Sequence, residues 1–249
     1  MKCFALLIFK GLVLIHCLPL FSQTERIVEF YDAVEKAAGE EGFQLTFVQP
    51  EMNLVDDYEN LQQIILIRHG EPALKKHGWL KRKEAQAFVR AYDSVGIYTP
   101  EKKPVLLYSN ELDTIFTSSI PRAKNTAELI FGADIAFQPY PLFREFERKI
   151  FAFPNLRLPL KYWLVKSRIL WFFGTNKKGI ESFSKAKKRA KQGVELLEQK
   201  AARDGKVVLV SHGLLNRFLV KYLKKNGWQV ARDGGSGYLA SWLLVRVGE

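Results

Sequence analysis

Two short and uninterrupted apolar runs constrain the fold of this chain most strongly. Residues Gln63–Arg68 (QIILIR) form the first run, and residues Lys206–Ser211 (KVVLVS) form the second. A strand that is apolar at successive positions is buried on both faces, as strands in the middle of a parallel sheet are. The sequence therefore predicts a sheet that helices cover on both sides.

Regular patterns before, between and after these runs supply the other elements. They predict two more strands, at residues 112–118 and 239–247, and four helices, at residues 83–95, 121–131, 180–203 and 214–225. Pro121 suits the first turn of a helix, where a missing N–H is not needed. Alternating strands and helices indicate an α/β fold. We expect a three-layer sandwich with a mostly parallel central sheet and helices on both faces.

One segment interrupts the alternation. Residues 142–180 combine aromatic and basic side chains, with two prolines at Pro154 and Pro159. We interpret this segment as a basic, aromatic-rich cap insertion over the ligand edge of the sheet, with a helix over residues 159–173. The segment is the least regular part of the pattern and the part most suited to contact a substrate.

The positive charge is concentrated in the same region. The net charge is +12, and residues 142–191 hold 14 Lys and Arg against three Glu, a local balance of +11. Such a stretch is a solvated helix face, a funnel for anionic substrates, or a surface that faces anionic lipid. We expect peripheral membrane contact, if it exists, through residues 156–178. No helix-turn-helix, zinc-finger or aromatic RNA-binding motif is visible, so nucleic acid is not an expected partner.

The N-terminus has the features of a targeting segment. Residues 1–23 combine a basic start, an apolar run and a polar exit, which predicts a signal peptide and an exported protein, periplasmic or secreted. Residues 24–62 would form an N-terminal extension that contains a short helix over residues 24–40. The alternative is a start at Met52, which would make the protein cytoplasmic. In both cases the main domain runs over residues 63–249.

Cysteine usage limits the chemistry of the main domain. The two cysteines, Cys3 and Cys17, both lie in the N-terminal apolar run. A disulfide framework, a thiolate nucleophile and a zinc–thiolate site are therefore excluded for the rest of the chain. With only four histidines, one of them at position 16, a histidine-rich metal site is not expected either.

Both apolar runs end in a histidine. The first continues as Arg68-His69-Gly70-Glu71 and the second as Ser211-His212-Gly213, while the strand at residues 112–118 leads into Arg122 in the first turn of its helix. The carboxyl ends of parallel strands face one ligand crevice, and helix N-termini there favour anions. Arginine binds phosphate oxygens in pairs, and imidazole can attack phosphorus. The pattern therefore indicates phosphoryl chemistry.

Three motifs together resemble those of a known family. Arg68-His69-Gly70, Ser118-Ser119-x-x-Arg122-Ala123-x-x-Thr126-Ala127 and Ser211-His212-Gly213 are similar to the motifs of the histidine phosphatase superfamily, the phosphoglycerate-mutase-like proteins. The resemblance runs from about Gln63 to the C-terminus. It implies that His69 is the phosphorylated nucleophile and that Arg68, Arg122 and His212 complete the phosphate pocket. Gly70 and Glu71 are expected to contact the substrate as well.

The resemblance also suggests a proton donor. The family places an acidic residue in a Leu-x-x-Glu context after the third strand, and Leu142-Phe143-Arg144-Glu145 matches this context. A donor is needed because an alkoxide is a poor leaving group. Glu145 is the candidate general acid, and Glu147 is its rival.

These observations predict a phosphomonoester hydrolase that acts through a phosphohistidine on an anionic phosphorylated small molecule. The alternatives are a phosphomutase that uses the same pocket, and a non-catalytic protein that binds a phospho-ligand at a membrane surface. No metal and no organic cofactor is expected, because two arginines can neutralise the charge that a metal would otherwise neutralise.

Overall fold

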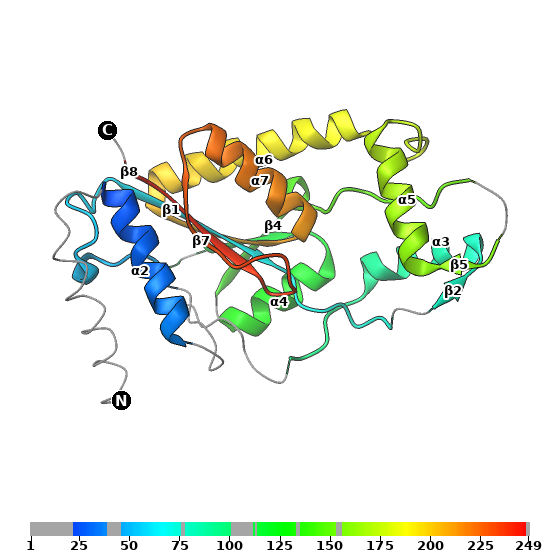
Figure 1. Cartoon of the computed structure of the whole chain (residues 1–249), viewed down its shortest axis with the longest axis horizontal. Coiled ribbons are helices and arrows are strands. Elements are labelled where there is room, and N and C mark those ends of the chain that lie inside the picture. The colour runs from blue at the N-terminus through cyan, green and yellow to red at the C-terminus, as the bar shows by residue number, and fades with distance from the viewer. Residues whose placement is uncertain are drawn as a thin grey trace.

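A six-stranded sheet forms the centre of the computed structural model, which describes residues 22–38, 46–75, 78–100, 112, 114–132, 135–152 and 156–247. The strand order is β4-β3-β6-β1-β8-β7 (Figure 1). The bounds are β1 (Leu61–Arg68), β3 (Thr114–Ser118), β4 (Ala136–Tyr140), β6 (Lys206–Ser211), β7 (Gln229–Asp233) and β8 (Ser241–Val247). The first four strands in this order pair in parallel, whereas β8 runs antiparallel to both of its neighbours. The expectation of a mostly parallel sheet is confirmed.

Helices cover both faces of the sheet. One face carries α2 (Gln23–Ala38) and α4 (Pro121–Phe131), whose apolar side chains share a core with β1, β6 and β8. The other face carries α6 (Phe183–Asp204) and α7 (Gly213–Lys225), which pack in a second core against the opposite side of the same strands. Figure 1 shows α6 and α7 above the sheet and α4 below it. The α/β sandwich with three layers is confirmed.

The two apolar runs form β1 and β6, which are adjacent strands in the middle of this sheet. Residues 64–67 of β1 and 208–210 of β6 have no solvent exposure. Their register pairs Ile67 with Val210 and Arg68 with Ser211. His69 and His212 therefore leave the sheet at equivalent positions of adjacent strands.

The two outermost strands were not predicted from the sequence. In β4 (AFQPY) no residue is fully buried, and in β7 (QVARD) only Ala231 is. Edge strands contact the core on one side over a short length, so they lack the apolar pattern that marks a central strand. Pro139 is tolerated in β4 because an edge strand does not need every N–H for pairing.

The N-terminal helix is an integral part of the sandwich. Ile27, Phe30 and Tyr31 of α2 are buried against the sheet, and the Tyr31 hydroxyl donates to the Thr46 carbonyl at 2.7 Å. This confirms the short helix that packs on the main domain. Residues 1–21, which hold nearly all of the predicted signal peptide, lie outside the described residues. Within the part of the chain that is described, no helix is long and apolar enough to cross a bilayer.

The cap is built from two separate stretches of the chain. Its elements are β2 (Trp79–Leu80), α3 (Arg82–Ser94), β5 (Leu158–Pro159) and α5 (Leu160–Phe172), which lie together at one end of the molecule (Figure 1). Two short 3-10 helices, η2 (Pro50–Met52) and η4 (Pro141–Phe143), precede β1 and the cap stretch. Ala85, Ile150, Phe151 and Trp163 form the cap core. The helix α5 forms where it was predicted, but α3 joins the cap and does not cover the sheet.

Candidate active site

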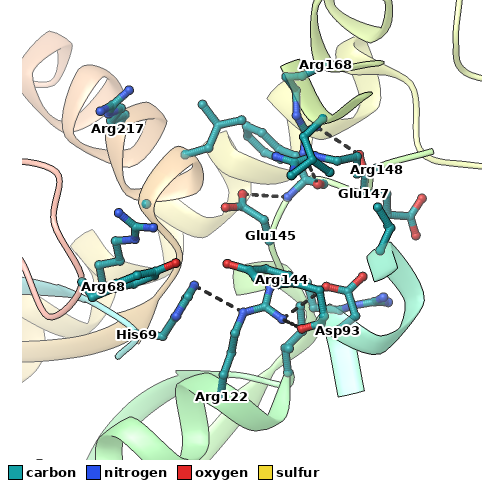
Figure 2. Close-up of a pocket in the computed structure, with 18 of the residues that line it drawn as sticks. Arg68, His69, Asp93, Arg122, Arg144, Glu145, Glu147, Arg148, Arg168 and Arg217 are labelled. Atoms are coloured by element: carbon teal, nitrogen blue, oxygen red, sulfur yellow. Dashed lines mark hydrogen bonds and ion pairs between the residues drawn. The ribbon is translucent and has the colours of Figure 1, made fainter. Parts of the chain in front are cut away.

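Three of the residues predicted from the motifs meet directly at the carboxyl ends of the strands. His69 follows β1, His212 follows β6, and Arg122 lies in the first turn of α4. The imidazole centroids of the two histidines are 5.1 Å apart. The Arg122 Nε lies 3.3 Å from the His69 Nε2. Together with Arg68, the last residue of β1, His69 and Arg122 line a cavity of about 350 Å³ (Figure 2).

Backbone contacts fix the orientation of His69. Its Nδ1 lies 2.7 Å from the Gly70 carbonyl oxygen. A carbonyl only accepts, so the proton is on Nδ1 and the lone pair is on Nε2, beside Arg122. The Gly70 N–H in turn donates to the Thr126 hydroxyl at 2.9 Å, and that hydroxyl donates to the Arg122 carbonyl at 2.6 Å. Gly70, which was predicted to contact the substrate, thus orients the histidine through its carbonyl.

Both histidines are neutral at neutral pH. Burial, and then the nearby Arg122 charge, lower the pKa of His69 to about 3. Burial, Arg122 and His69 likewise hold the pKa of His212 well below its ordinary value. A neutral imidazole is the form that attacks an electrophile, and in this structure the lone pair of the His69 Nε2 accepts a hydrogen bond from the Arg122 Nε–H.

His212 is held by the end of the neighbouring strand. Its Nε2 lies 2.8 Å from the hydroxyl of Ser118, which itself accepts a hydrogen bond from the Ile120 N–H at 3.2 Å. The Ser118 hydroxyl can donate to Nε2, and in that tautomer the proton of the imidazole is on Nδ1. This Nδ1 is buried and has no hydrogen-bond partner among the described residues.

Two residues of α3 hold Arg122. Its Nη1 donates to the Tyr92 carbonyl at 2.6 Å and to the Asp93 carboxylate at 3.2 Å, and its Cζ lies 4.5 Å from the Tyr92 ring centroid. The Arg122 side chain is 1% exposed, whereas that of Asp93 is 54% exposed. Tyr92 and Asp93 were not predicted from the sequence, because no motif distinguishes them from the residues of an ordinary helix.

Arg68 is held from the other side of the cavity. Its Cζ lies 4.4 Å from the ring centroid of Tyr238, and its Nη1 donates to the Ser236 carbonyl. The Tyr238 ring is also 5.8 Å from that of His69. Gly213 allows this arrangement, since a Cβ there would lie 3.0 Å from the Arg68 Cδ and Nε. Tyr238 belongs to the turn before β8, which carries no recognisable motif.

The two candidate acids both line the cavity but differ in their contacts. The Glu145 carboxylate accepts a hydrogen bond from the Phe146 N–H at 2.9 Å. The Glu147 carboxylate accepts from the Glu181 N–H, in the link between α5 and α6, and its carbonyl accepts from Arg168 at 3.0 Å. Glu147 therefore joins two parts of the cap.

Glu71 lies outside the site. Its side chain is exposed, it does not line the cavity, and its carbonyl accepts from the Tyr98 N–H at 2.8 Å. The next residue, Pro72, pairs with Ile97 in an isolated bridge. Glu71, for which the sequence predicted a substrate contact, is therefore placed outside the lining of the cavity that contains His69.

A family model shows which family the chain belongs to. The model of the histidine phosphatase superfamily (branch 1) matches residues 64–247. The chain belongs to this superfamily. No sequence among curated proteins matches the chain.

Solved structures of similar proteins were also found. A phosphoglycerate mutase from Bacillus anthracis is 17% identical, with 75% of this chain and 88% of that chain covered and a TM-score of 0.47. A mycobacterial glucosyl-3-phosphoglycerate phosphatase is 21% identical, with 74% and 90% covered and a TM-score of 0.42. A putative alpha-ribazole-5'-P phosphatase from Escherichia coli is 20% identical, with 65% and 79% covered and a TM-score of 0.41.

The cavity of this superfamily member is more basic than the motifs predicted. Arg68 and Arg122 share it with four further arginines, which Figure 2 shows around the candidate acids: Arg144, Arg148, Arg168 and Arg217. Its acidic lining residues are Asp93, Glu145 and Glu147. Burial lowers the pKa of Arg148, and it lowers that of Arg168 to about 10, so both stay protonated at neutral pH. The cavity is therefore suited to a ligand with more than one negative charge.

Proposed function

We propose that this protein is a phosphomonoester hydrolase that works through a phosphohistidine at His69. The observation that carries the proposal is the state of this imidazole: it is neutral, Gly70 holds its Nδ1, and its Nε2 lies beside the Arg122 guanidinium at the cavity. A phosphoryl group that approaches Nε2 comes within reach of the guanidinium groups of Arg122 and Arg68, which both line the cavity.

The reaction proceeds in two displacements. The His69 Nε2 attacks phosphorus, a P–N bond forms, the P–O bond of the ester breaks, and the leaving oxygen takes a proton from the acid. Water then attacks the same phosphorus and gives a proton back to the carboxylate, and the P–N bond breaks to release inorganic phosphate and neutral His69. Arg68, Arg122 and the His212 Nδ1–H stabilise the charge on the phosphoryl oxygens in both transition states.

Glu145 is the acid in this proposal. Both glutamates line the cavity, but the Glu147 carboxylate is bound to the backbone N–H of Glu181 and serves to link cap segments. The Glu145 carboxylate is bound only to the adjacent N–H among the hydrogen bonds described for it, so its second oxygen is available to a leaving group. Glu147→Gln is accordingly the matched control for Glu145→Gln.

The substrate in this proposal is a small anionic molecule that carries at least one negative charge besides the phosphate. Arg144, Arg148 and Arg217 line the cavity in addition to the arginines next to His69. A second anionic group, such as a carboxylate or another phosphate, would neutralise part of this excess charge.

The proposal is tested by single-turnover trapping with labelled aryl and alkyl phosphates. We expect wild type to hydrolyse both and to form an acid-labile, base-stable phosphoprotein, and His69→Ala to do neither. Glu145→Gln should slow the formation of the phosphoprotein from alkyl esters at least a hundredfold, and from aryl esters much less, because aryl oxides leave without a proton. It should also accumulate the labelled protein, since the water step lacks its base. Glu147→Gln should retain most of the activity.

The outcomes separate the alternatives. Equal slowing of phosphoprotein formation from aryl and alkyl esters by Glu145→Gln would contradict its role as the acid. Transfer of label to another position of the same substrate would identify a phosphomutase. If wild type and His69→Ala both bound phosphate esters and neither turned them over, the protein would be a phospho-ligand-binding protein and not an enzyme.

A further inference from the structure

The outward face of α5 is apolar although it is exposed to solvent. Tyr162, Val165, Ile169 and Phe172 are all exposed, Ile169 to 48%, and Phe173 just after the helix is 80% exposed. At about 100° per residue, the four helical positions fall within about a quarter of the helix circumference. They form one continuous stripe, which we call the outer stripe (Tyr162, Val165, Ile169 and Phe172).

The opposite face of the same helix is apolar as well. Leu160, Trp163 and Trp171 are buried, Trp163 in the cap core and Trp171 against Phe146. A surface helix normally presents polar residues on the side away from its core. The outer stripe therefore cannot be explained as the face that holds α5 in the fold.

Basic residues border the outer stripe. By the same helical geometry, Lys161 lies on one side of it and Lys166 on the other, where the Lys166 Nζ is 3.1 Å from the Tyr162 hydroxyl. Lys177 and Lys178 are exposed in the turn that follows the helix. From Arg148 to Ile180 the sequence contains eight Lys and Arg and no Asp or Glu.

Other apolar residues are exposed next to the start of α5. Trp79 is 64% exposed and Leu156 is 56% exposed. Trp79 is held there because β2 pairs with β5, which leads directly into the helix, and its partner is Pro159. Tryptophan and tyrosine are side chains that favour the interface between water and lipid headgroups.

We propose that α5 is an interfacial helix that docks this protein on an anionic lipid surface. In this arrangement the outer stripe enters the headgroup region, and Lys161, Lys177 and Lys178 contact the anionic headgroups. The positive charge around the outer stripe favours an anionic lipid surface over another copy of the chain. A second copy of the chain would bring the same basic face against itself in a two-fold contact, which like charges oppose.

Docking through the outer stripe leaves the site on the other side of the helix. Leu164 and Arg168 of α5 line the cavity that contains His69. The helix would therefore lie between the membrane and the cavity and place the cavity close to the lipid surface. The inference does not depend on the proposed hydrolysis, because it rests on exposed residues that do not line the cavity.

Vesicle co-sedimentation of the full chain tests the proposal, with phosphatidylcholine alone or with phosphatidylcholine and phosphatidylglycerol at 7:3. Four double variants are compared with wild type, and one of them, Val165→Leu with Ile169→Leu, keeps the outer stripe apolar. Val165→Ser with Ile169→Ser removes the centre of the outer stripe, and Lys161→Gln with Lys178→Gln removes two bordering charges. Lys187→Gln with Lys188→Gln removes two charges from α6, where no large apolar side chain is exposed. Circular dichroism checks that each variant is folded.

We expect wild type to bind the anionic vesicles at least tenfold more tightly than the neutral ones. Binding should fall about tenfold when the stripe is changed to serine, and about fivefold for each bordering lysine removed. The α6 variant should stay within twofold of wild type, and Val165→Leu with Ile169→Leu should bind as wild type does.

Three results would overturn the proposal. The first is wild-type binding that ignores the phosphatidylglycerol content, and the second is a stripe variant that binds as tightly as wild type. The third is a wild-type dimer in sedimentation velocity without lipid that becomes a monomer in the stripe variant, because the stripe would then be an interface between two copies.

Discussion

At the residue scale, the tautomer of His69 is determined by a backbone carbonyl and its neutral state by burial. The Gly70 carbonyl determines which ring nitrogen carries the proton, and burial keeps the ring neutral. The Thr126 hydroxyl connects Gly70 to Arg122, because it accepts a hydrogen bond from the Gly70 N–H and donates one to the Arg122 carbonyl. The His69 imidazole and the guanidinium beside it are therefore oriented through one buried hydroxyl.

Removing this hydroxyl should cost both stability and activity. Thr126→Val leaves the Gly70 N–H buried without a partner, so we expect the free energy of unfolding to fall by about 1–3 kcal/mol. The turnover number should fall about tenfold or more, because the Gly70 carbonyl that orients His69 is released. Urea denaturation and steady-state kinetics measure the two effects. Thr126→Ser retains the hydroxyl and is the control; if it were as impaired as the valine variant, the methyl group would be the important part.

The depressed pKa of His69 predicts a pH dependence of stability. The unfolded histidine titrates near its ordinary value of about 6.5, and the folded one at about 3. Between these pH values the unfolded state binds more protons than the folded state. The contribution of neutral His69 to the free energy of unfolding is therefore fully present above about pH 6.5 and is lost as the pH falls toward 3. The free energy of unfolding should fall by up to about 1.4 kcal/mol per pH unit for this group.

Denaturant melts between pH 7 and 5 measure this slope. His69→Asn, which cannot titrate in this range, should have a shallower slope than wild type by that amount. Identical slopes for the two proteins would show that the folded imidazole titrates normally.

At the element scale, the sequence predicted the segments that are buried on every side. The strands β1 and β6 coincide with continuous apolar runs, and α4 and α7 begin where the motifs placed them. The edge strands β4 and β7 were missed because their residues are mostly exposed. The helix α3 was found, but its membership of the cap depends on the contact with α5 and β2, which periodicity does not encode.

The helix α2 should be essential for stability. Phe30 is 5% exposed and lies in the core that α2 shares with the sheet. Phe30→Ala should lower the free energy of unfolding by about 3–5 kcal/mol, measured by urea denaturation. Asp32→Ala, at an exposed position of the same helix, should change it by less than about 0.5 kcal/mol. A chain that begins at Met52 lacks α2 entirely. If this truncated chain were as stable as the full chain, α2 would not be essential for stability.

At the scale of the whole molecule, the fold gathers positive charge from distant parts of the sequence. The motifs identified Arg68 and Arg122, whereas Arg144, Arg148, Arg168 and Arg217 come from the cap stretch and from α7. A count of charge along the chain showed the excess but could not show which guanidiniums converge. That convergence depends on the path of residues 144–150 over the sheet edge, which lacks regular secondary structure.

Substrate capture should therefore depend on salt. Raising the ionic strength from about 0.05 to about 0.5 M shortens the Debye length about threefold, so the KM should rise, and more steeply for a substrate with two anionic groups than for an aryl phosphate. Arg217→Gln should flatten this dependence in initial-rate assays. Lys187→Gln on α6, which does not line the cavity, is the matched control and should leave it unchanged. A KM that is independent of salt for both substrates would argue against steering by the cavity.

The pairing of β1 with β6 has a consequence for how this site tolerates mutation. His69 and His212 extend from neighbouring strands in register, so their separation is inherited from the spacing of the peptide hydrogen bonds, about 4.8 Å in any sheet. Core substitutions change how firmly the sheet is held, but they do not change that repeat. The distance between the two imidazoles should therefore change little when the surrounding sequence changes. The cap lies outside the sheet, so its residues can change, and with them the molecules that fit the cavity, without altering that distance.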